Sequence, residues 1–87
     1  MEITIKMPTC LAPRLIEIKV SEGDRIVLGD ILFSYESDGA LMFEYSACSG
    51  TVVEILAAVG RKIRIGDPIM VVDGDPLTAD GEMFPPR

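Results

Sequence analysis

Short alternations of apolar and polar residues run along most of the chain and are separated by turns every few residues. A period of two is typical of strands that bury one face. Residues 53–59 are the one local candidate for a helix. The β-branched run Thr51-Val52-Val53 at its start and Gly60 at its end favour a strand instead. We therefore expect strands over residues 3–7, 15–20, 25–28, 31–36, 41–45, 51–56, 62–65 and 69–73.

The second half of the chain repeats the first at an offset of 37 residues. Gly23 corresponds to Gly60, and Gly29-Asp30 corresponds to Gly66-Asp67. These glycines fix the register, because glycine adopts backbone angles that other residues avoid. Each half is too small to bury its apolar face alone, so the halves are expected to pack together. The sequence thus predicts an all-β fold, a flattened sandwich (barrel-sandwich hybrid) of two small antiparallel sheets with quasi-twofold symmetry.

The length of 87 residues fits one compact domain with a thin core. We expect the domain to occupy residues 1–75. Residues 76–87 show little periodicity and contain Asp80-Gly81 and Pro85-Pro86, so they are interpreted as a tail or linker. The core is expected to be drawn from a pool of apolar strand positions, some of which alternation places on the other face: Ile16, Ile18, Val20, Ile26, Leu28, Leu32, Val53, Ile55, Ile63, Ile65, Ile69 and Val71.

The formal net charge of −6, without any basic block, argues against nucleic acids and anionic membrane surfaces as partners. It favours protein partners with basic patches. No apolar run approaches the roughly 20 residues that span a bilayer. The first residues, Met1-Glu2-Ile3-Thr4, lack the features of a signal peptide. We therefore expect a location in the cytoplasm or an organelle matrix.

Few side chains offer catalytic chemistry. The chain has no histidine, which excludes Ser-His-Asp and Cys-His nucleophilic systems and removes the commonest metal ligand. Cys10 and Cys48 are expected to be free thiols, and they form no metal site. The carboxylates Glu36, Asp38 and Glu44 are interpreted as a solvated polar face rather than an acid–base pair. We expect that the domain alone is not an enzyme and binds no metal.

An ordered set of residues resembles the lipoyl domains of 2-oxo acid dehydrogenase acyltransferase (E2) components, and the resemblance covers residues 3–73. Biotin carrier domains share this architecture, but they usually show a Met-Lys-Met tip that is absent here. The residues that carry the resemblance are Met7-Pro8, Glu22-Gly23-Asp24, Gly29-Asp30, Glu36-Ser37-Asp38-Gly39-Ala40, Glu44, Ser46, Gly50, Val52, Glu54-Ile55, Gly60 and Gly66-Asp67-Pro68-Ile69.

The resemblance implies a tip hairpin formed by Glu36, Ser37, Asp38, Gly39 and Ala40. In such domains the tip motif is Asp-Lys-Ala, and a ligase acylates its lysine to make a swinging arm. Here Gly39 stands at that position, so no lipoyl cofactor can be attached there. The turn itself is retained, because Asp-Gly is among the best two-residue hairpin turns.

The resemblance also points to candidate partner contacts around the tip. A loop that commonly lies beside the tip in lipoyl domains is short here and contributes Thr9, Cys10 and Leu11. Asp38, Met42 and Glu44 complete the candidate set. At least one of Met42 and Phe43 is expected to pack inward.

Three hypotheses remain open at this point. The first is a lipoyl-like pseudo-carrier that acts through protein contacts, within a dehydrogenase-type complex or alone. The second is a true lipoyl domain in which Gly39 replaces a native lysine. The third is an unrelated binding or assembly module on the same fold, for which self-association through residues 41–45 would be evidence.

Overall fold

The computed structural model describes residues 1–76 as an all-strand domain, so the tail or linker expected over residues 76–87 lies outside this part except for its first residue. No helix long and apolar enough to cross a membrane occurs within residues 1–76. The strands, in chain order, are β1 (Glu2–Lys6), β2 (Arg14–Ile18), β3 (Arg25–Ile26), β4 (Ile31–Ser37), β5 (Ala40–Tyr45), β6 (Gly50–Ile55) and β7 (Pro68–Gly74).

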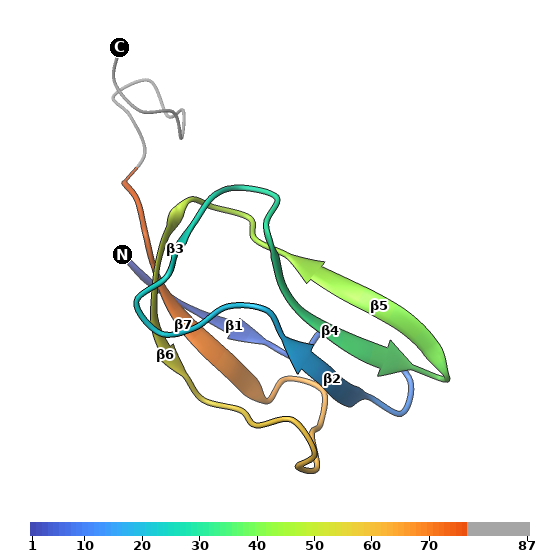
Figure 1. The fold of residues 1–87 in the computed structure, drawn as a ribbon. Coiled ribbons are helices and arrows are strands. Elements are labelled where there is room, and N and C mark those ends of the chain that lie inside the picture. The colour runs from blue at the N-terminus through green and yellow to red at the C-terminus, as the bar shows by residue number, and fades with distance from the viewer. Residues whose placement is uncertain (77–87) are drawn as a thin grey trace.

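The strands form two antiparallel sheets that face each other (Figure 1). One sheet has the order β1-β7-β6-β3, and the other has the order β2-β4-β5. Two facing sheets bury their apolar sides against each other and leave the outer sides to solvent. The prediction of a flattened β sandwich is confirmed.

The strand registers show the quasi-twofold symmetry that the repeat predicted. Leu15 pairs with Tyr35 between β2 and β4, and Val52 pairs with Val72 at the equivalent place between β6 and β7. Each of these pairings is followed by the same one-residue bulge. The pairing of β5 with β4 likewise matches that of β1 with β7. Each sheet therefore has the same three-stranded frame, and only one of them has a fourth strand.

The strand expected over residues 62–65 is absent, so this prediction was wrong. Its counterpart β3 pairs with the start of β6. The same register in the other half would set Lys62 opposite Arg14 and Ile63 opposite Pro13. Like charges directly opposite one another destabilise a strand pair. Proline in addition has no N–H for the ladder, which removes one of the few hydrogen bonds available.

The core lies between the two sheets, and strand bulges decide which residues reach it. Ile26, Leu32 and Ile69 of the expected pool are buried. Val53, from the same pool, is exposed because it is the extra residue at the bulge in β6. Leu28 and Ile65 are exposed because they lie in turns. The buried apolar residues outside the expected pool are Met7, Leu15, Phe33, Tyr35, Cys48, Val52, Met70 and Val72.

Candidate functional site

The hairpin between β4 and β5 forms a protruding end of the molecule (Figure 1). Ser37 pairs with Ala40, which leaves Asp38 and Gly39 as a two-residue turn. Both central residues have positive φ, 50° at Asp38 and 82° at Gly39. This combination defines a type I′ turn, for which Asp-Gly is a preferred sequence. The tight tip hairpin expected from the sequence is therefore present.

Gly39 fits this turn for conformational reasons. A Cβ atom placed there would meet no atom within 4 Å, so space alone would admit a side chain. The positive φ nevertheless favours glycine over other residues. No amine lies at this position, and the lysines of the chain are elsewhere. Lys6 ends β1, Lys19 follows β2, and Lys62 lies in an irregular segment before β7.

The loop over residues 8–13 is fastened to the tip by two hydrogen bonds. The N–H of Asp38 donates to the carbonyl oxygen of Leu11 at 2.7 Å. The N–H of Leu11 donates to Oγ of Ser37 at 3.1 Å. The structure thus brings Leu11 and Asp38 together, and both are exposed. Thr9 is also exposed, whereas Cys10 is partly buried and packs against the core.

Met42 and Phe43 are both exposed, with 43% and 39% of their surfaces accessible, so the expectation that one of them packs inward was wrong. Their strand, β5, is the edge of its sheet. The tip hairpin also extends past the facing sheet, which leaves neither side of β5 fully covered (Figure 1). A projecting edge strand with apolar side chains is a surface for association.

Glu44 is a candidate contact residue that is only partly exposed to solvent. It pairs with the buried Phe33 across the hairpin. Burial raises the pKa of the Glu44 carboxyl above its ordinary value of 4.5. Folding therefore disfavours the ionised form. The domain therefore has its full stability while the Glu44 carboxyl is protonated, at pH values below the unfolded pKa of this group. Part of that stability is lost as the pH rises through the folded pKa.

Replacing Glu44 with glutamine should therefore reduce the pH dependence of the unfolding free energy between the unfolded and the folded pKa of this carboxyl. We expect the variant to be more stable than the parent at pH 7 and to lose this advantage at pH 4, because the parent carboxyl is then protonated. Urea unfolding at both pH values measures the difference. Glu54→Gln on β6 controls for the general loss of a negative charge, since Glu54 is exposed. An equal response of both variants would contradict the assignment.

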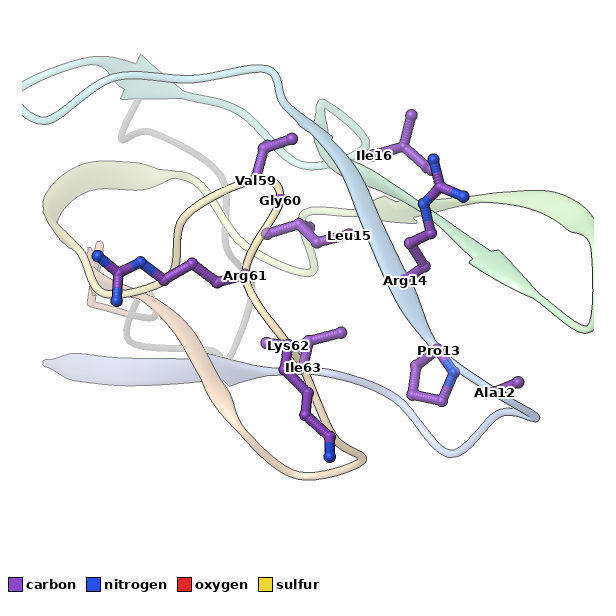
Figure 2. Close-up of a pocket in the computed structure, with 10 residues that line it drawn as sticks. All are labelled: Ala12, Pro13, Arg14, Leu15, Ile16, Val59, Gly60, Arg61, Lys62 and Ile63. Carbon is purple, nitrogen blue, oxygen red and sulfur yellow. The ribbon is translucent and has the colours of Figure 1, made fainter.

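A groove of about 620 Å³, which the sequence patterns did not reveal, opens between residues 12–16 and residues 59–63 (Figure 2). Three cationic side chains, Arg14, Arg61 and Lys62, are among its lining. A signal was available in the repeat. Arg61 replaces the acidic residue found at the equivalent turn position of the first half, Asp24.

Comparisons of the sequence with known proteins identify its family. The sequence profile of the biotin/lipoyl family, described as biotin-requiring enzyme, matches residues 3–72. The chain is 34% identical over 67 residues to the dihydrolipoyllysine-residue acetyltransferase component of the mitochondrial pyruvate dehydrogenase complex from Dictyostelium discoideum. The match covers 75% of this chain and 11% of that protein. With two matching sheets and a tip hairpin in place, this chain belongs to the biotin/lipoyl carrier domain family and is related to E2 acyltransferase components.

Proposed function

We propose that this domain acts by binding other proteins and does not itself carry a lipoyl or biotinyl group. The observation that carries this proposal is Gly39 at the apex of the tip hairpin. In this family the cofactor is joined to a lysine amine at that place. The residues present at this tip do not fit such a group, because none of them supplies an amine.

The geometry of the turn gives independent support. A type I′ turn requires positive φ at both central residues, and Asp-Gly meets this requirement without strain. A lysine at residue 39 would have to adopt a φ that L-residues avoid, at a cost of about 1 kcal/mol. The Asp-Gly sequence thus forms the tip turn without strain, which supports a role of the tip as a rigid contact surface.

The surface around the tip supplies the proposed contacts. Leu11 and Asp38 are joined by the loop hydrogen bond, and Met42 follows on the edge strand. The net charge of −6 favours a partner with basic patches. Components of a dehydrogenase-type complex, in the cytoplasm or an organelle matrix, are the candidates that the family relation suggests. On this proposal the domain alone has no catalytic activity.

A second candidate function is an ordinary swinging-arm domain whose lysine is replaced by Gly39 in this sequence. The open space at the Cβ position of Gly39 favours it, since a long side chain would project freely. The native codon and the intact mass of the protein from its own source separate the two. A glycine codon with an unmodified mass supports the pseudo-carrier. A lysine codon with an added lipoyl or biotinyl mass overturns it.

The Gly39→Lys variant tests whether the tip retains the geometry of a carrier. We expect lipoyl ligase to add one lipoyl group to this variant and none to the parent, because the hairpin presents residue 39 to solvent. Mass spectrometry of the ligase reaction measures the addition. Gly23→Lys is a matched control, since Gly23 also has positive φ and open space but lies at a different turn.

The variants must be shown to be folded before the ligase assay is interpreted. A folded Gly39→Lys variant that is not lipoylated would remove the second candidate, because the surroundings of the tip would then lack what a ligase recognises. Lipoylation of Gly23→Lys would show that the assay does not discriminate between turns.

A further inference from the structure

The groove lies where the symmetry of the fold predicts a counterpart of β3, at residues 62 and 63. In the first half the turn before β3 is tied to β6. The N–H of Gly23 donates to the carbonyl oxygen of Val52 at 2.8 Å, and the N–H of Val52 donates to that of Asp24 at 2.9 Å. Within residues 1–76, no equivalent backbone hydrogen bond joins Leu15 to Gly60 or Arg61. The second half is open at this place (Figure 2).

Side chains explain why only one half is closed. Asp24 accepts a hydrogen bond from the N–H of Ser21 at 2.8 Å, and Glu22 accepts one from the N–H of Ile55 at 2.9 Å. The repeat places Arg61 and Val59 at the positions of Asp24 and Glu22. Neither arginine nor valine has a side-chain acceptor. The second turn therefore lacks both the side-chain bond that caps the first turn and the one that joins the first turn to β6.

Among the described residues, the open half leaves the edge of β2 without a backbone partner at Leu15, whose side chain is buried. Leu15 and Val52 share register and bulge, and the peptide group of Val52 is directed away from β7 toward the first turn. By the same alternation, the N–H and C=O of Leu15 face the groove. A free strand edge pairs readily with an added extended segment. Val59 and Ile63 add apolar surface to the groove wall.

The charge of the groove is opposite to that of the chain. The net charge is −6 with eight Lys and Arg residues, and three of these eight line the groove. Arg14 has a carboxylate oxygen of Glu36 at 4.0 Å, whereas Arg61 and Lys62 form no ion pair among the described residues. Cationic side chains without close partners favour an anionic ligand.

We propose that this groove binds an acidic, extended peptide segment of a partner protein, which adds to the free edge of β2. Backbone groups of the segment pair with those of Leu15, its acidic side chains meet Arg14, Arg61 and Lys62, and its apolar side chains rest on Val59 and Ile63. A peptide suits the site better than a small anion because the edge offers backbone pairing as well as charge. The site does not depend on the residue at position 39.

Amide hydrogen exchange on the free 87-residue chain is the first test. The amide of Leu15 should exchange at least about tenfold faster than that of Val52. The N–H of Val52 donates to the carbonyl oxygen of Asp24, and the N–H of Leu15 has no equivalent acceptor among the described residues. Equal protection of the two amides would mean that the groove is closed in solution, and would overturn the proposal.

Binding is then measured by NMR on the isotopically labelled chain, with a capped heptapeptide of alternating glutamate and valine as the probe. Shift changes should concentrate in residues 12–16 and 59–63 and spare the closed counterpart around residues 22–26 and 50–52. A peptide with lysine in place of glutamate is the control. Equal binding of the basic peptide, or changes confined to β5, would contradict the proposal. Displacement of the probe by a single-stranded oligonucleotide would also do so.

Three variants test the charge and the closure of the groove in turn, and closure is measured by the protection of the Leu15 amide. Lys62→Gln should weaken probe binding about threefold, while Lys19→Gln, outside the groove lining, should leave it unchanged. The double variant Val59→Glu and Arg61→Asp gives the second half the two side-chain acceptors that Glu22 and Asp24 provide in the first half. It should protect the amide of Leu15 and abolish probe binding. Undiminished binding in this closed variant would overturn strand addition, and none of these results bears on Gly39.

Discussion

Replacing Phe33 with alanine is expected to destabilise the domain by about 3–5 kcal/mol, enough to unfold most of the chain at room temperature. Phe33 has no exposed surface and lies in the central strand β4 of its sheet. Its ring centroid is 5.9 Å from that of Tyr35. In so thin a core the surrounding strands have few side chains with which to refill the cavity. Urea unfolding monitored by circular dichroism and tyrosine fluorescence measures the loss.

Phe43→Ala is the matched control for this prediction. Phe43 lies on the neighbouring strand of the same hairpin and is 39% exposed. Its removal should reduce the unfolding free energy by about 1–2 kcal/mol, less than the loss at Phe33, since more than a third of its surface is already in solvent. A cost equal to that of Phe33→Ala would mean that β5 is covered in solution, for example by a second copy of the chain. A dependence of stability on protein concentration would reveal such a cover.

Replacing Gly50 with alanine is the second change with a large expected effect. A Cβ atom at Gly50 would lie 2.3 Å from the carbonyl oxygen of Asp73 and 2.9 Å from Cα of Gly74. Both of these are backbone atoms of β7, so the neighbouring strand would have to move away. We expect a loss of at least about 3 kcal/mol, measured by the same unfolding experiment.

Gly23→Ala distinguishes this steric effect from the general cost of replacing glycine. Gly23 has a φ of 89°, but a Cβ atom there would meet no atom within 4 Å. Its replacement should cost about 1 kcal/mol from backbone strain alone. If Gly50→Ala proved no more damaging than Gly23→Ala, the close approach between β6 and β7 would not exist in solution.

One loop connects the tip to the groove. Leu11 is hydrogen bonded to the tip hairpin, and the next two residues, Ala12 and Pro13, line the groove. Ala12 has a positive φ of 47°, which is unusual for a residue other than glycine, asparagine or aspartate. The two surfaces proposed for protein contacts are therefore adjacent along the chain. A single partner could engage both, and the NMR mapping would detect this as shift changes that continue from residues 12–16 to the tip.

The turns of the fold are determined by residues that are close together in the sequence. In each Gly-Asp turn the aspartate caps its own turn: Asp30 accepts from the N–H of Val27 and Asp67 from that of Arg64, both at 2.9 Å. These bonds span three residues, so the repeated residues suffice to produce them. The tip turn is equally local, because Asp38-Gly39 supplies the two positive φ values on its own. The absence of an amine at residue 39 needed no structure either.

Long-range contacts decided the remaining features. The bulge at Val53 reverses the alternation that a pattern of period two would continue, so Val53 faces solvent although it belonged to the expected core. The missing strand at residues 62–65 depends on what stands opposite it, Pro13 and Arg14, nearly fifty positions earlier in the chain. Hydrogen bonds and charge repulsion act between neighbours in space. A repeat in sequence can therefore predict two equal halves, while the partners that each half meets determine that one closes and the other stays open.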